Sequence, residues 1–155
     1  MSEPDFDLAA AHRWFAADCF NRAWEYIYKK ERTPEEDEEM IRLSLASVWH
    51  WTQRPDCTNT NRSIGLWQNA RVYALAGQVD NARRYAQMCL AISKSGDVPP
   101  FYLGYAYEAL ARAERMAGNQ QKAGELVAEA RQLAPQVTEK EDRDILLADL
   151  DTIIS

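Results

Sequence analysis

The sequence has no long apolar run and no cluster of basic residues. None of its 155 residues belongs to a stretch that approaches the roughly 20 apolar residues needed to span a bilayer. The net charge is −6, with 24 acidic and 18 basic side chains, so the attraction that drives binding to phosphate backbones is missing. We therefore expect neither a membrane nor a nucleic acid as partner.

Cysteine is also scarce. Cys19, Cys57 and Cys89 are widely spaced and form no CxxC pair, which argues against a disulfide framework. The first ten residues are rich in acids and show neither the basic nor the apolar region of a secretory signal. We expect a cytoplasmic protein with reduced thiols.

The common catalytic motifs are missing as well. The sequence contains no GxSxG, Walker A loop, HExxH or GxGxxG. Most of its carboxylates fall at helix starts or on solvated faces, and acids are ordinarily favoured in the first turn of a helix. We therefore expect no enzymatic activity and no cofactor.

What the sequence does have is helical periodicity with clear helix ends. Apolar residues recur three and four apart, and Thr33, Pro34 and Glu36 form the pattern of a capping box. Residues 54–63 are dense in turn formers and predict a loop. No segment favours a strand, so we expect a single all-α domain. It consists of three antiparallel hairpins, at about residues 6–53, 64–93 and 101–134, and a C-terminal helix at about residues 139–154.

The second and third predicted hairpins repeat one another. Gly118 follows Gly77 by 41 residues, and Ala123 follows Ala82 by the same interval. The glycine turns the chain between two helices, and the alanine five residues later allows those helices to approach closely. Because one hairpin cannot bury its own apolar faces, repeated hairpins are expected to stack.

This pattern resembles the tetratricopeptide repeat. The matching residues are Tyr73, Gly77, Ala82 and Leu90 in one copy, and Ala111, Gly118, Ala123, Ala130, Ala134 and Pro135 in the next. The chain departs from the pattern in its period, since the usual repeat has about 34 residues, and at Cys89 and Glu114, where alanine and tyrosine are usual. As a whole it is similar to small uncharacterised bacterial proteins of this type. The resemblance implies an α-α superhelix with a capping helix at its C-terminal end and a non-enzymatic, protein-binding role.

The resemblance also implies a concave groove lined by the first helix of each hairpin. The groove positions fall on Ile64, Trp67, Arg71, Ala74 and Leu75 in one copy and on Tyr105, Glu108, Arg112, Arg115 and Met116 in the other. Arginines in the groove of an acidic protein would suit an acidic or C-terminal peptide, because a guanidinium pairs bidentately with a carboxylate. The alternative is that the arginines pair with nearby glutamates. A groove filled by the chain's own last helix would exclude a peptide ligand.

A second candidate site lies in the first predicted hairpin. His12 lies about as far before a turn near Arg32 as His50 lies after it. We therefore expect the two imidazoles to be neighbours, and tryptophans 14, 49 and 51 to surround them. The arrangement would make either a small-ligand or metal pocket or a packed aromatic cluster.

The metal interpretation lacks ligands. Two imidazoles can bind a transition metal, but a structural zinc needs four ligands. The other candidate ligands, Cys57 and Asp18, do not follow a recognised metal-ligand spacing. We assign no metal to this chain.

Three functions remain open from the sequence. The first is a module or scaffold that binds a peptide segment, which is possibly acidic, in a helical groove. The second is a structural homodimer that pairs through the aromatic first hairpin near Trp14 and Trp49. The third is a small-ligand or metal sensor at His12, Trp14, His50 and Trp51.

Overall fold

The computed structural model describes residues 4–154, and that range contains seven α-helices, one short 3₁₀-helix and no strand. The helices are α1 (Leu8–Ile27), α2 (Pro34–Thr52), α3 (Asn59–Leu75), α4 (Val79–Ser93), α5 (Pro100–Met116), α6 (Gln120–Leu133), η1 (Ala134–Gln136) and α7 (Lys140–Ile154). The predicted all-α class is confirmed.

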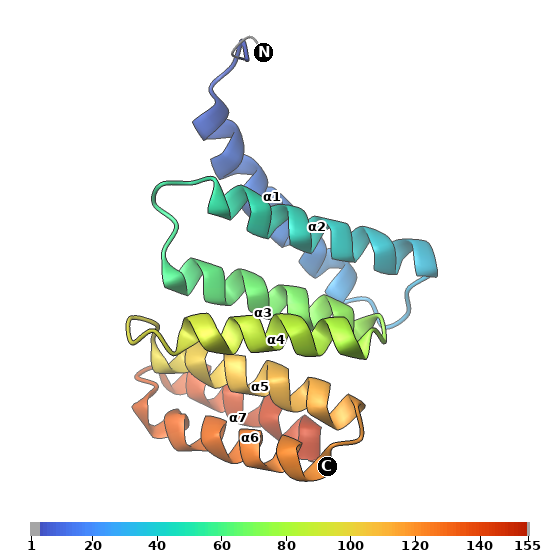
Figure 1. Ribbon diagram of the computed structural model, residues 1–155, viewed down its shortest axis with the longest axis vertical. Coiled ribbons are helices and arrows are strands. Elements are labelled where there is room, and N and C mark those ends of the chain that lie inside the picture. Colours follow the sequence, from blue (N-terminus) through green and yellow to red (C-terminus); the bar gives the residue numbers. More distant parts are fainter. Residues whose placement is uncertain (1–3, 155) are drawn as a thin grey trace.

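The helices form one stack in which each packs on its neighbours in sequence. The most extensive contacts join α1 to α2, α3 to α4, and α5 to α6, while α2 packs on α3, α4 on α5, and α7 on both α5 and α6. In Figure 1 the stack descends from α1 and α2 to α6 and α7, so the two ends of the described chain lie at opposite ends of the molecule.

The core is distributed between the stacked helices. One apolar cluster joins α3, α4 and α5 around Leu90 and Leu110, and another joins α5, α6 and α7 around Leu146 and Leu150. Among residues 4–154, no helix combines the length and the apolar character needed to cross a membrane.

Two capping boxes fix the starts of α2 and α3. The predicted box is present, since the Glu36 backbone N–H donates to Thr33 Oγ1 (3.2 Å) and the Thr33 N–H donates to Glu36 Oε2 (3.0 Å). The loop predicted over residues 54–63 is too long, because α3 begins at Asn59 instead of about residue 64. Thr58 and Asn61 cap this helix reciprocally. This capping box is hard to recognise in the sequence because its N3 residue is asparagine instead of the usual Glu or Gln.

The two predicted repeat turns have the same backbone geometry. Gly77 and Gly118 adopt φ values of 73° and 83°, a region in which only glycine is unstrained. The residue after each glycine donates its backbone N–H to the carbonyl five residues earlier in the chain: Gln78 to Tyr73 and Asn119 to Glu114, both at 2.9 Å. This is the Schellman pattern that ends a helix.

The alanines of the repeat are buried as the pattern predicts. Ala82 and Ala123, each five residues after its glycine, are both 1% exposed. A larger side chain at either position would therefore separate packed helices.

Glu114 is a buried acidic residue beside the turn between α5 and α6. Its carboxylate is buried and accepts two hydrogen bonds from Arg83 of α4 (3.0 and 3.1 Å) and one from Asn119 (2.6 Å), while Lys122 of α6 lies 3.4 Å away. Burial alone would raise the pKa of Glu114, but the hydrogen bonds from Asn119, Arg83 and Lys122 lower it overall. One ionised side chain thus joins three helices at the turn.

We expect Glu114→Ala to lower the free energy of unfolding by roughly 2 kcal/mol or more, because it leaves Arg83 and Asn119 without their partner. Urea unfolding followed by circular dichroism measures the change. The matched control is Glu125→Ala, an exposed residue of α6 whose side chain accepts a hydrogen bond from Gln121, for which we expect a change within about 0.5 kcal/mol. Equal effects of the two substitutions would contradict this account of the turn.

Candidate functional site

Side chains from four helices, most of them aromatic, line a large hollow of the molecule. This hollow has a volume of about 430 Å³ and lies where α1, α3, α5 and α7 face one another. Its lining consists of Phe20, Trp24, Tyr28, Ser63, Ile64, Trp67, Phe101, Tyr102, Tyr105, Ile145 and Asp149. We call it the aromatic groove.

Helical periodicity places these rings on one face of each helix. Phe20 and Trp24 of α1 and its C-cap residue Tyr28 follow one another at intervals of four residues, and Phe101 and Tyr105 are four apart on α5. Residues at this spacing lie one above the other on a helix. Because α1, α3 and α5 present these faces to a common space, the groove is a consequence of the stack.

The rings contact one another across the helices. Trp24 and Trp67 stack with centroids 5.8 Å apart, Trp67 meets Tyr105 edge to face at 5.6 Å, and Tyr105 meets Phe101 at 5.1 Å. All four side chains are half-buried. The row is therefore held in place by its own packing while part of its surface remains accessible to a ligand.

A hydrogen-bond network under the row joins α3, α5 and α7. Trp67 Nε1 donates to Glu108 Oε2 (3.0 Å), and Arg112 Nε donates to Glu108 Oε1 (2.7 Å). Arg112 also donates to Thr152 Oγ1 (3.0 Å) and weakly to the Asp149 carbonyl (3.4 Å). Glu108 is 2% exposed. Both charges of this pair are thus satisfied within the protein.

Tyr105 extends the network to α7. Its hydroxyl donates to Asp149 Oδ2 at 2.7 Å. Burial, this hydrogen bond and the negative charge of Asp149 all raise the pKa of Tyr105, so the phenol stays neutral. The contact ties α7 to the rim of the aromatic groove.

Arg71 differs from the other two arginines of the predicted groove. Arg112 pairs with Glu108, and Arg115 donates to Gln120, whereas Arg71 makes no hydrogen bond or ion pair with any residue in the range 4–154. Burial lowers the pKa of Arg71 and the positive charge of Arg112 lowers it further, while the negative charges of Glu108 and Asp149 offset part of this shift. A half-buried guanidinium that makes no direct contact with an anion is unfavourable, so Arg71 is, of the three arginines, the one best prepared to accept an anionic ligand.

Further hollows continue from the aromatic groove past Arg71. A small one of about 10 Å³ shares Trp67 with the aromatic groove and is lined by Arg71 and Glu108, and the next, of about 240 Å³, contains Arg71 and Arg112. Residues Thr152 and Ile153 of α7 line the last one. The last helix therefore forms a wall of the groove without filling it.

The structure brings the ten predicted groove residues to these hollows. Ile64, Trp67 and Tyr105 line the aromatic groove, Glu108 lines the small hollow, and Arg71, Ala74, Leu75, Arg112, Arg115 and Met116 line the last one. That they bind a ligand stays a prediction. The sequence analysis missed the contributions of α1 and α7, although the four-residue spacing of Phe20 and Trp24 is the signal that points to α1.

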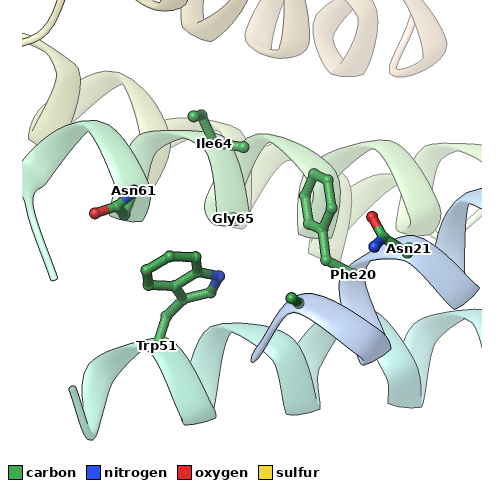
Figure 2. Close-up of a pocket in the computed structure, with 7 residues that line it drawn as sticks. Phe20, Asn21, Trp51, Asn61, Ile64 and Gly65 are labelled. Carbon is green, nitrogen blue, oxygen red and sulfur yellow. The ribbon is translucent and has the colours of Figure 1, made fainter. Parts of the chain in front are cut away.

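The two histidines are neighbours, as the register predicts. His12 Nδ1 and His50 Nδ1 are 2.9 Å apart, and one donates to the other. Phe15 stacks on His50, and Trp49 contacts both imidazoles. Trp51 is not part of this cluster: it lines a separate hollow between α1, α2 and α3, shown in Figure 2.

The histidine pair does not gather a set of metal ligands. Asp18 pairs with Arg22, and the thiol of Cys57 contacts the Thr58 carbonyl. No group of three histidine, cysteine or acidic side chains that could hold a metal ion occurs in the described part of the chain. The two imidazoles thus belong to an aromatic cluster, and a ligand at this place stays a prediction.

No family model, no curated protein and no solved structure significantly matches this chain. Its function is therefore inferred from the contacts of its own residues.

We expect the stability of the α1–α2 pair to depend on pH through His50. Burial and the neighbouring His12 lower the pKa of His50, so the unfolded chain binds the proton more readily than the folded one. The free energy of unfolding should then fall as the pH drops below about 6.5. His50→Phe, which can keep the stacking on Phe15, should lose this part of the dependence.

Urea unfolding of both proteins from about pH 7.5 to about pH 5 measures the difference. Other titrating groups are common to the two proteins, so the difference between the curves reports the loss of His50 and of its contact with His12. Parallel curves would contradict the expectation.

Proposed function

We propose that this chain is a non-enzymatic interaction module that binds an acidic peptide segment in the aromatic groove. The observation that carries the proposal is Arg71, a half-buried guanidinium without a partner in the described chain, beside a row of accessible aromatic rings. Aromatic faces supply contact area with little loss of side-chain entropy, and an arginine supplies a directional contact to a carboxylate.

The proposal includes a finer description of the fold. We propose a tetratricopeptide-like α-α superhelix of three antiparallel hairpins, α1–α2, α3–α4 and α5–α6, with α7 as the capping helix. The matching turns at Gly77 and Gly118 and the buried alanines after them support this description. In it, α1, α3, α5 and α7 line the concave face, which is the face that carries the groove.

The expected setting follows from charge and cysteine content. With a net charge of −6, the chain repels nucleic acid and acidic surfaces as a whole, so an acidic ligand depends on the local positive charge of Arg71. We propose a cytoplasmic location, where the buried thiols of Cys19 and Cys89 stay reduced.

We expect Arg71→Leu to separate stability from binding. The substitution removes a half-buried charge that has no partner, so the free energy of unfolding should stay the same or rise, by up to about 1 kcal/mol. The immobilised wild type should retain a partner from an extract of the source cell, and immobilised Arg71→Leu should not. Arg112 is unsuitable for this test, because its removal leaves the buried carboxylate of Glu108 without its charge partner.

The matched control is Arg62→Leu, an exposed arginine in the first turn of α3. It makes the same chemical change on the same helix outside the groove, and the partner should be retained. A partner held equally by wild type and Arg71→Leu would contradict the proposed role of the groove.

A second function, homodimerisation through α1 and α2, is favoured by one observation. Trp14 and Phe15 of α1 and Trp49 of α2 are 60%, 42% and 55% exposed, and these two helices form one end of the described stack. Exposed apolar patches of this kind mark interaction surfaces. A ligand at the His12–His50 pair is a further alternative with fewer supporting contacts.

For a homodimer, we expect the wild type to sediment as a dimer, and Trp14→Ser with Trp49→Ser to weaken the dimer about tenfold or more, since both tryptophans lie in the proposed interface. The control is Met88→Ser, an exposed apolar residue of α4. A monomeric wild type at about 100 μM would exclude a stable dimer.

A further inference from the structure

A second hollow opens beside the aromatic groove, between α1, α2 and α3. Its volume is about 160 Å³, and Phe20, Trp51 and Ile64 are its main apolar walls. Figure 2 shows the indole of Trp51 rising from α2 toward Ile64 and Gly65 of α3, with Phe20 of α1 on the other side. We call it the ring pocket.

Gly65 lets α3 approach α2 at the ring pocket. A Cβ atom at this position would lie 2.7 Å from Cγ2 of Val48, closer than two carbon atoms pack. The helices therefore meet at the glycine, and no side chain of position 65 enters the space that Trp51 and Phe20 enclose.

Trp51 is held in place before any ligand arrives. The guanidinium of Arg54 lies 3.9 Å from the centre of its ring, a cation–π contact. Arg54 is in turn fixed by two hydrogen bonds to Asp56, at 2.9 and 2.8 Å. Such pre-organisation reduces the entropy lost on binding.

The ring pocket and the aromatic groove adjoin, since Phe20 and Ile64 line both. The carboxamides of Asn21 and Asn61 flank the ring pocket in Figure 2. A carboxamide can donate and accept hydrogen bonds at once, which suits the backbone of a peptide. The pocket thus has a mainly apolar lining with two carboxamides beside it.

The size of the ring pocket fits one aromatic side chain. An apolar cavity of about 150 Å³ suffices for benzene in a protein core, and the ring pocket is open on one side, so a larger ring can enter partly.

The position of Arg71 indicates that the ligand also carries a carboxylate. Ile64 and Arg71 are seven residues apart on α3, which is two turns on one face and about 10 Å along the helix. An extended peptide advances about 3.3 Å per residue. The unpartnered guanidinium of Arg71 would therefore meet a carboxylate about three residues from a ring in the pocket.

We infer that the ring pocket holds an aromatic side chain of an acidic peptide whose carboxylate, about three residues away, pairs with Arg71. The inference rests on the proposed function and specifies its ligand. The ring provides the buried anchor, and the carboxylate sets the register of the peptide along α3.

Indole tests the ring pocket alone. We expect indole to shift the backbone amide resonance of Gly65 saturably in the wild type, and this shift to be abolished in Ala17→Leu and in Asn21→Leu. Both substitutions place a larger apolar side chain at an exposed position on the rim of the pocket, so they should leave the fold intact. The control is Ala91→Leu on an exposed face of α4, which should bind indole as the wild type does. No saturable shift, or equal binding by the blocked variants, overturns the inference.

Short peptides test the ligand. The probes are acetyl-Trp-Gly-Gly-Asp-amide and its reverse order, each compared with a version in which Ala replaces Trp. In the wild type we expect the Trp peptide of one order to bind about tenfold tighter than its Ala version, and this preference to disappear in Ala17→Leu.

The results separate the inference from the proposed function. If acidic peptides bind with no preference for Trp, the ring pocket is not an anchor site and the groove function stands. If no acidic peptide of either kind binds, the proposed function fails and the inference fails with it. Replacing the Asp of the peptide by Asn should weaken its binding to the wild type but not its binding to Arg71→Leu. An equal loss of affinity for both proteins overturns the pairing of the carboxylate with Arg71.

Discussion

The carboxylate of Glu108 is the contact on which the groove depends. It is buried, and it accepts hydrogen bonds from Trp67 of α3 and from Arg112 of its own helix. The first bond fixes the central ring of the aromatic row, and the second neutralises the charge and leads, through Arg112, to Thr152 of α7. The Glu108–Arg112 pair therefore links three of the helices that line the groove, α3, α5 and α7.

Arg71 lies near this contact and is attracted by the charge of Glu108, but it makes no hydrogen bond or ion pair within residues 4–154. Both oxygens of Glu108 are already occupied by Trp67 and Arg112, and the guanidinium of Arg112 repels a second cation nearby. A network that satisfies one arginine thus leaves the other prepared for an anion from outside. Binding sites commonly contain groups that lower the stability of the free protein, and Arg71 is such a group. The packed aromatic row beside it reduces the entropy lost when a ligand binds.

Local signals in the sequence predict most of the fold. The turns at Gly77 and Gly118, the all-α class and the neighbouring histidines all follow from glycine position, periodicity and register. The start of α3 does not, because Asn61 caps where glutamate is expected. The site is only partly predictable: repeat spacing places Arg71 and Arg112 together, but which of them is paired depends on contacts between helices that sequence spacing does not determine.

The most direct measurement is a selection of peptides from a random library on the immobilised wild type and on Arg71→Leu. The account predicts that the wild type enriches sequences with a carboxylate, that these sequences also carry an aromatic residue, and that Arg71→Leu no longer enriches the carboxylate. The absence of any enriched sequence, or the same acidic sequences on both proteins, would contradict it.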